Sequence, residues 1–311
     1  MIKVYIDIIF FVFMKVQKIG SRGFLFTFPD FIPYPQVPMS IQIYVINGKN
    51  HLFICDTGIE KEQMIMLKDY LKDKNLLSKP IIIFNSHFHM DHIGGNGVFE
   101  TAQIISHISC RANMVQTMER IKKEKKARLK DKSIAYPTII FQERMVFPQD
   151  NVEFFYSPGH SEDSASCYDQ LDKVLYVGDN LVDPLPFLTW HRIDRYLITL
   201  QNYCNFDTKV IILGHNLVLN DISFIEESIN YIEKFRDFDI DITDFTPRHS
   251  AWYRWSFIYI GLDLKDKGKD KEALKYFKHI KDLIRHPKIK PLDEEELGEI
   301  EGFLKEELEN K

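Results

Sequence analysis

The chain reads Asn85-Ser86-His87-Phe88-His89-Met90-Asp91-His92-Ile93-Gly94-Gly95-Asn96 directly after an apolar run at residues 81–84. Three imidazoles and a carboxylate therefore lie within six residues. Alternate side chains of an extended segment share a face, which predicts that His87, His89 and Asp91 converge on one point. His92 leaves this row as the chain turns, and the glycine pair lets the backbone bend closely. Imidazole and carboxylate groups are ligands of zinc and iron, so the stretch predicts a metal-binding loop.

The composition indicates an ordered globular protein. The chain has 311 residues, of which 45% are hydrophobic and 13% aromatic, and it can bury a sizeable core. A net charge of -5 gives no overall attraction to nucleic acid or to an anionic membrane, so we expect a small-molecule substrate and neither of those partners. The four cysteines are scattered without a CxxC pair, which is typical of reduced thiols and favours a cytoplasmic location.

Two N-terminal segments are unusual. Residues 2–13 are strongly apolar but too short to span a bilayer, and we interpret them as an extra β-strand or as sequence upstream of the natural start, with a membrane tether as the alternative. Residues 21–40 combine five aromatic side chains with four prolines. Proline disfavours both a regular helix and a central strand, so this segment is predicted to be an ordered loop that packs on the body of the protein or lines a substrate pocket.

The pattern from residue 41 onward has an α/β order. Residues 41–46 and 51–55 are predicted strands joined by a turn that contains Asn47-Gly48. A helix at 62–77 and a strand at 81–84 follow, and the basic run 120–132 is predicted to be a solvated helix face, although it could contact phosphate. Two sheets packed face to face with helices outside would bury these elements. The later predicted strands are at 103–108, 138–141, 145–147, 152–156, 166–168, 174–177 and 209–213, and the strand at 209–213 is expected to be the last. The later predicted helices are at 112–130, 193–203 and 222–235.

The C-terminal part differs in composition. From residue 252 there is no strand signal, and the apolar residues between 258 and 280 have the spacing of one tetratricopeptide-like helix–turn–helix. Gly268 falls in the predicted turn, and Ala273 and Phe277 face the first helix. One such unit cannot bury its own apolar face, so we expect it to dock on the main domain or on a second subunit, as in a homodimer formed through these helices. The predicted domains are residues 1–243 and 244–311.

Three further motifs repeat one arrangement. Pro158-Gly159-His160, Gly178-Asp179 and Gly214-His215 each follow an apolar strand, with a glycine that allows close approach and then a side chain of a metal-ligand type. One such motif is weak, because a single histidine or aspartate after a strand is usually structural. Three in succession after the histidine-rich stretch predict that all four belong to one metal site.

Together with Asp56-Thr57-Gly58, these motifs stand in the order found in the metallo-β-lactamase superfamily, which the chain resembles over about residues 14–235. The resemblance implies an αβ/βα sandwich of two mixed β-sheets with flanking helices, followed here by a C-terminal helical extension. It also implies two divalent metal ions, zinc in first place and manganese or iron as alternatives. Carried over by position, the first metal would be held by His87, His89 and His160, the second by Asp91, His92 and His215, and both by Asp179.

The resemblance implies a hydrolase in which a hydroxide shared by two cations attacks a small ester, thioester or lactone. Asp91 would also pass a proton to the leaving group. Asp179 in place of cysteine argues against a true zinc β-lactamase, and the residues after Asp179 lack the tyrosine of the acyl-homoserine lactonases. Residues 24–38, Phe187 and Trp190 are expected to bind an acyl or aromatic group. The alternatives are a phosphodiesterase or nuclease, and an oxygenase of the persulfide dioxygenase kind that uses a single iron.

Overall fold

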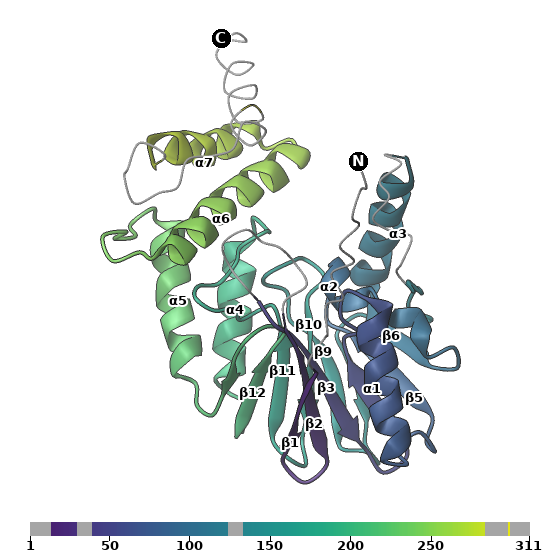
Figure 1. Cartoon of the computed structure of the whole chain (residues 1–311). Helices are drawn as coiled ribbons and strands as arrows, with labels where there is room; N and C mark the ends of the chain where they lie inside the picture. The colour runs from purple at the N-terminus through teal and green to yellow at the C-terminus, as the bar shows by residue number, and fades with distance from the viewer. Residues whose placement is uncertain (1–13, 30–38, 124–132, 284–297, 299–311) are drawn as a thin grey trace, which may run out of the picture.

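The structure is a computed structural model that describes residues 14–29, 39–123, 133–283 and 298. Two mixed β-sheets face each other, and helices flank them, as the sequence predicts (Figure 1). In the described part of the chain the first sheet has seven strands in sequence order, and the second has six in the order β13-β12-β11-β10-β9-β8. The strands of the first sheet are β1 (Lys15–Ile19), β2 (Gly23–Phe28), β3 (Ile41–Asn47), β4 (Leu52–Cys55), β5 (Ile81–Asn85), β6 (Gln103–His107) and β7 (Ile139–Phe141). Those of the second are β8 (Arg144–Phe147), β9 (Val152–Tyr156), β10 (Ala165–Asp169), β11 (Val174–Gly178), β12 (Val210–Leu213) and β13 (Val218–Leu219).

Both faces of the central strands are buried, which explains their nearly continuous apolar sequences. Along β5, Ile82 and Phe84 point to the space between the sheets, whereas Ile83 packs under the outer helices. The second sheet contributes Phe154 to the same inner layer, and its ring stacks on Phe84 with the centroids 4.4 Å apart. Side chains of alternate residues therefore build an inner core and two outer cores from the same strands.

Helices cover the two outer faces. Helix α1 (Lys61–Asp73) lies on the first sheet, and α4 (Ile193–Tyr203) and α5 (Ser223–Arg236) lie on the second (Figure 1). The short α2 (Met90–Ile93), the 3-10 turn at Asn96–Val98 and α3 (Ile108–Lys123) follow the ends of β5 and β6. Residues 124–132, which complete the predicted basic run, lie outside the described residues.

The parallel strand pairs place the site at one edge of the sandwich. Strands β4, β5 and β6 run parallel to one another, and β11 runs parallel to β12. The predicted ligand motifs follow the carboxyl ends of β5, β11 and β12, and residues of parallel strands that end together lie at the same edge. This topology brings segments that are up to 128 residues apart in sequence, His87 and His215, into one place.

The predicted loop at residues 21–40 is wrong in its first part. Residues 23–28 form β2, which pairs with β1 on one side and β3 on the other. The prolines that argued against a strand all come after Phe28, so β2 keeps its ladder N–H groups. Phe26 and Phe28 are fully buried beneath α1, and they do not line a pocket. The rest of the aromatic segment, residues 30–38, lies outside the described residues, as do residues 1–13.

The expectation that residues 209–213 form the last strand is also corrected, because the two-residue β13 follows and pairs with β12.

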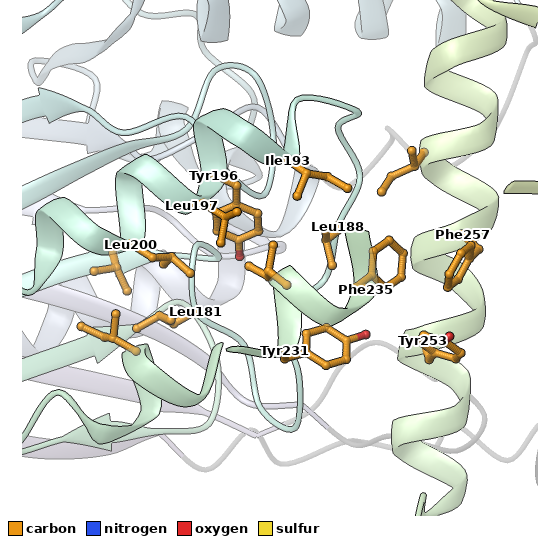
Figure 2. Packing of buried hydrophobic residues seen from close by; sticks show 14 of the residues in the cluster. Leu181, Leu188, Ile193, Tyr196, Leu197, Leu200, Tyr231, Phe235, Tyr253 and Phe257 are labelled. Carbon is orange, nitrogen blue, oxygen red and sulfur yellow. The ribbon is translucent and has the colours of Figure 1, made fainter. Parts of the chain in front are cut away.

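The predicted helix–turn–helix is present. Helices α6 (Pro247–Asp266) and α7 (Asp270–Leu283) are joined by a turn in which Gly268 has a φ of +70°. Phe277 packs against Gly261, where an added Cβ would come within 2.7 Å of its ring. The hairpin docks on the main body through α6, whose Tyr253 and Phe257 join Phe235 of α5 in one hydrophobic cluster (Figure 2). The domain boundary at 243 and the homodimer stay predictions. Among the described helices, none combines the length and apolar character needed to cross a bilayer.

Candidate metal centre

The metal loop changes conformation in its middle, and this corrects one prediction. His89 is extended, with φ -63° and ψ 147°, but the chain becomes helical at Met90. His87 and His89 therefore point to one place, while Asp91 turns toward His92 and a different set of partners. The predicted row of His87, His89 and Asp91 is wrong, because one turn of helix interrupts the alternation of an extended strand.

Three imidazoles form the first group. His87 Nε2 lies 3.0 Å from His89 Nδ1, and His160 Nε2 lies 3.1 Å from the same atom. His87 and His160 are buried, and His89 is partly exposed. Two nitrogens bound to one tetrahedral zinc ion lie about 3.3 Å apart, given zinc–nitrogen distances of about 2.0–2.1 Å. The spacing of these nitrogens therefore fits a shared cation.

Two carboxylates and two imidazoles form the second group. His215 Nε2 lies 3.2 Å from Asp91 Oδ2 and 3.4 Å from Asp179 Oδ2. His92 Nε2 lies 3.7 Å from Asp91 Oδ2 and 3.3 Å from Asp179 Oδ1. The ligand atoms of the group all lie within 4.8 Å of one another. Nitrogen and oxygen donors of this kind suit zinc, iron or manganese.

Asp179 connects the two groups. Its Oδ2 lies 3.9 Å from His87 Nε2 and 4.0 Å from His160 Nε2, in addition to its short contacts with His92 and His215. The carboxylate thus faces four imidazoles, two from each group. A carboxylate in this place can be shared by two cations.

Hydrogen bonds to the opposite ring nitrogens set the orientation of four imidazoles. His160 Nδ1 donates to the carbonyl of Phe187 at 2.7 Å, and His215 Nδ1 donates to the carbonyl of Ser40 at 2.9 Å. His92 Nδ1 donates to Asp56 Oδ2 at 2.7 Å, and His87 Nδ1 lies 3.0 Å from Ser86 Oγ. Each bond leaves the lone pair of Nε2 directed into the centre, as hydrogen bonds to the outer nitrogen of a metal-binding histidine do.

Asp56 supports both groups at once. Its carboxylate is fully buried and accepts hydrogen bonds from the amide and the hydroxyl of Ser86, at 2.7 and 2.6 Å. The same carboxylate accepts from His92 Nδ1 and from the hydroxyl of Tyr176, at 2.7 and 2.6 Å. Because the Ser86 hydroxyl donates its proton to a hydrogen bond with Asp56, its oxygen can accept a hydrogen bond from His87 Nδ1. One carboxylate therefore orients an imidazole in each group.

Two buried polar atoms test whether cations fit. His92 Nε2 and Asp179 Oδ1 are buried, and neither makes a hydrogen bond with any described residue. Leaving a buried polar atom without a partner costs about 1–3 kcal/mol, so such atoms normally have one. Both atoms face the second group, where a cation would satisfy them. The donor set and its unsatisfied atoms therefore fit metal binding.

The electrostatics of the two groups differ. Burial lowers the pKa of each imidazole in the first group, and the adjacent His160 adds to the effect at His89, whose pKa falls to about 3. These rings are neutral at pH 7, as metal coordination requires. In the second group burial lowers the pKa of His215, but the carboxylates of Asp179 and Asp91 together outweigh burial and raise that pKa to about 10. Protons therefore compete with a cation at the second group.

Comparison with known proteins places this centre in a family. The model of the Metallo-beta-lactamase superfamily matches residues 37–215, which is more than half of the chain and spans both metal groups. The chain belongs to the metallo-β-lactamase superfamily. The acyl-coenzyme A thioesterase MBLAC2 of Bos taurus is 21% identical over 219 residues, which cover 62% of this chain and 78% of that protein.

Solved metallo-β-lactamases share the fold. The enzyme from Pontibacter korlensis matches with a TM-score of 0.58 at 18% identity, over 71% of this chain and 99% of its own. The enzyme from Hirschia baltica matches with a TM-score of 0.56 at 16% identity, over 70% of this chain and 97% of its own. Nearly the whole of each enzyme is therefore matched by about 70% of this superfamily member.

Two glycines allow the strand ends to approach one another. Gly178 has a φ of +54°, and a Cβ there would lie 2.8 Å from Ser86 Oγ. A Cβ on Gly214 would overlap Asp179 Oδ1 and would lie 2.8 Å from His92 Cε1. We expect Gly214→Ala to weaken zinc binding at the second group by about tenfold or more, because Asp179 and His92 must move. Zinc titration against a chelator measures this effect, and unchanged affinity would contradict it.

Sequence reasoning found the candidate ligands but missed the residues that orient them. Asp56 stands in a sequence motif that assigns it no role, and Ser86 stands directly before the first histidine of the metal loop. The carbonyl of Phe187 has no sequence signal, because a backbone acceptor does not depend on residue type. Asn180 accepts a hydrogen bond from the His160 amide at 2.9 Å and could have been noticed only as the polar neighbour of Asp179.

Asp163 is a buried carboxyl close to the centre. It is fully buried, and neither of its oxygens has a hydrogen-bond partner of normal geometry among the described residues. Burial raises its pKa to about 6, above the unfolded value of about 3.9. The folded state therefore binds more protons between these values, and the stability of the protein falls as pH rises from about 4 to 6.

We expect Asp163→Asn to stabilise the metal-free protein by about 2–3 kcal/mol at pH 8, because the amide never has to ionise. The gain should shrink to a small fraction of this value near pH 4, where the carboxyl is protonated in the folded state and about half protonated in the unfolded state. Denaturant unfolding at the two pH values measures it. A gain of equal size at pH 4 and pH 8 would show that ionisation is not its cause.

Proposed function

We propose that this protein is a metal-dependent hydrolase that uses two divalent cations, zinc in first place, to cleave ester, thioester or lactone bonds. The observation that carries the proposal is the pair of inward-facing donor groups that share Asp179, with the outer nitrogens of four of the five imidazoles held by hydrogen bonds. The first cation would be held by His87, His89 and His160, and the second by Asp91, His92 and His215. When bound, two such cations lower the pKa of water toward neutrality and polarise a carbonyl oxygen.

The residues of the chain itself hold the imidazoles in place and transfer a proton. The hydrogen bonds on their outer nitrogens keep four imidazoles in place before any substrate arrives, so little reorganisation is needed during the reaction. Asp91 is the more exposed carboxylate of the second group, with 19% of its side chain accessible compared with 9% for Asp179. With Oδ2 directed at His92 and His215, its other carboxylate oxygen can hold a proton and pass it to a leaving alkoxide or thiolate. We therefore assign it the acid role in addition to metal binding.

Apolar side chains beside the metal groups support an acyl substrate. The ring of Phe88 lies 4.7 Å from that of His89, and the ring of Phe187 lies 5.9 Å from that of His160. Phe88, Met90, Phe187 and Trp190 are all partly exposed, so they can contact a bound molecule. Apolar surface of this kind favours an acyl chain over a phosphate group. The thioesterase named among the relatives supports a thioester in particular.

A panel of substrates tests the proposal on zinc-loaded protein. Acyl-coenzyme A thioesters, aryl esters, lactones and a phosphodiester would be compared by kcat/KM. We expect the carbon esters or thioesters to react faster than the phosphodiester, and longer acyl chains to lower KM. Faster cleavage of the phosphodiester would favour a nuclease. Oxygen consumption with a single bound iron would favour an oxygenase, and either result would contradict the proposal.

A further inference from the structure

We propose that helix α6 of the C-terminal extension is a positioning element of the metal centre, and that it acts through Ser256 on His160. The inference rests on the metal centre proposed above, and it holds whichever bond the enzyme cleaves. Helix α6 begins at Pro247, beyond residues 37–215 that match the superfamily model. The helix would thus give this chain a support for His160 that the matched region does not contain.

The peptide group between Phe187 and Leu188 joins the helix to the ligand. Its carbonyl oxygen accepts a hydrogen bond from His160 Nδ1 at 2.7 Å, and its N–H donates a hydrogen bond to Ser256 Oγ at 3.1 Å. The Ser256 hydroxyl donates to the carbonyl of Trp252, one turn earlier in α6, at 2.9 Å. A lone pair of Ser256 is therefore free to accept from Leu188. Hydrogen bonds in such a chain polarise one another, so Ser256 strengthens the bond that Phe187 makes to His160.

The hydrogen bond between Ser256 and Leu188 is shielded from water. Ser256 and Leu188 are both fully buried, and Leu188 belongs to the cluster that includes Phe235 and Phe257 (Figure 2). Water cannot readily replace a hydroxyl removed from this place. Loss of the Ser256 hydroxyl would leave the buried Leu188 N–H without an acceptor, and the peptide would turn to find another partner.

One face of α6 holds the whole loop from Asp183 to His191. The contacting residues recur every three or four positions, which places them along a single helix face. Asp263 Oδ2 accepts from the His191 amide at 2.9 Å and lies 2.6 Å from His191 Nδ1. The remaining contacts are Arg248 Nη1 with Asp183 Oδ2 at 3.0 Å, and the Phe187 ring with the rings of Trp252 and Tyr259 at 5.2 and 5.6 Å. The loop is thus fixed at both ends and in the middle.

The outer partner of a metal-binding histidine sets its orientation and basicity, and its loss typically lowers metal affinity by about 10–100-fold. We expect Ser256→Ala to weaken zinc binding by about tenfold or more at one of the two sites and to leave the other unchanged. Zinc titration of the full-length protein against a chromophoric chelator resolves the two affinities. In the cobalt-substituted protein, the visible absorption of one site should shift.

Ser228 provides a matched control. It lies on α5, is 2% exposed, and donates to the carbonyl of Phe224 one turn earlier at 2.6 Å, so Ser228→Ala removes the same kind of buried hydroxyl. Both zinc affinities and the cobalt spectrum should stay unchanged in this control. Ser256→Thr, which keeps the hydroxyl, should restore tight binding. Asp263→Ala, at the far end of the loop, should weaken the same site to a smaller degree and serves if Ser256→Ala does not fold.

The outcomes separate this inference from the proposed function. If the wild type binds two zinc ions and Ser256→Ala binds both with unchanged affinities, the inference alone is overturned. Equal weakening of both sites in Ser256→Ala and Ser228→Ala would also overturn it, because it would indicate a general loss of stability. Wild-type protein that binds neither zinc nor manganese nor iron would overturn both the inference and the proposed function.

Discussion

Asp179→Ala is expected to lower hydrolysis at least about a thousandfold, which corresponds to about 4 kcal/mol at the transition state. The reason is that Asp179 is the carboxylate that faces both metal groups, with Oδ1 3.3 Å from His92 Nε2 and Oδ2 3.4 Å from His215 Nε2. Its removal leaves four imidazoles facing one another without the shared negative charge. The measurement is kcat/KM on the best substrate of the panel, with the metal content determined on the same sample.

Asp207→Ala is the control for this change, because it removes an exposed carboxylate that pairs with Lys173. Activity and metal content should remain near those of the wild type. If Asp179→Ala retained more than about a tenth of the activity, the assignment of Asp179 as the shared ligand would be wrong.

Asp56→Asn is expected to have the largest effect on stability. An amide nitrogen in place of either oxygen would face the donors of Ser86, His92 or Tyr176, all of which point at the buried carboxylate. Breaking a buried charged network of this kind costs about 3–5 kcal/mol. Zinc affinity should also fall at both sites by about 10–100-fold each, because His92 and His87 lose their fixed orientation. Denaturant unfolding and chelator competition measure the two effects.

Tyr176→Phe calibrates the effect of Asp56. It removes one donor to the carboxylate and leaves the others, so it should cost only about 1–2 kcal/mol and little zinc affinity. A loss of stability in Asp56→Asn no greater than that in Tyr176→Phe would mean that Asp56 does not organise the centre.

The candidate ligands were predictable because they follow strands. An apolar strand, a glycine and then a histidine or aspartate is a local pattern, and the parallel strands bring the local patterns to one edge. The division of His87, His89 and Asp91 between two groups was predictable only from the family resemblance. Residue alternation gave the wrong answer there, because the chain changes from extended to helical at Met90.

Strand β2 shows a second limit of predicting structure from the sequence. The proline content of residues 21–40 as a whole argues against a strand, but the prolines lie after Phe28 and leave the preceding hydrogen bonds intact. The alternation of Phe24, Phe26 and Phe28 was itself a strand signal. Composition over a long window therefore obscured a short element with a clear period of two.

The link between α6 and the centre could not be predicted from sequence. Ser256 and Leu188 are 68 residues apart, and the bond between them uses a backbone N–H that any residue except proline supplies. Helical spacing predicted that the extension must dock somewhere, and the structure shows that it docks on the loop that carries Phe187. Such contacts depend on how elements pack in three dimensions, for which a single sequence has no local signal.

Metal content tests the central claim most directly. Full-length protein would be freed of metal, titrated with zinc, separated from excess ion and measured by elemental analysis. Two tightly bound zinc ions per chain are predicted, falling below two in Asp179→Ala. Wild-type protein that retains well under one zinc, manganese or iron ion per chain would contradict a two-metal hydrolase built on His87, Asp179 and His215.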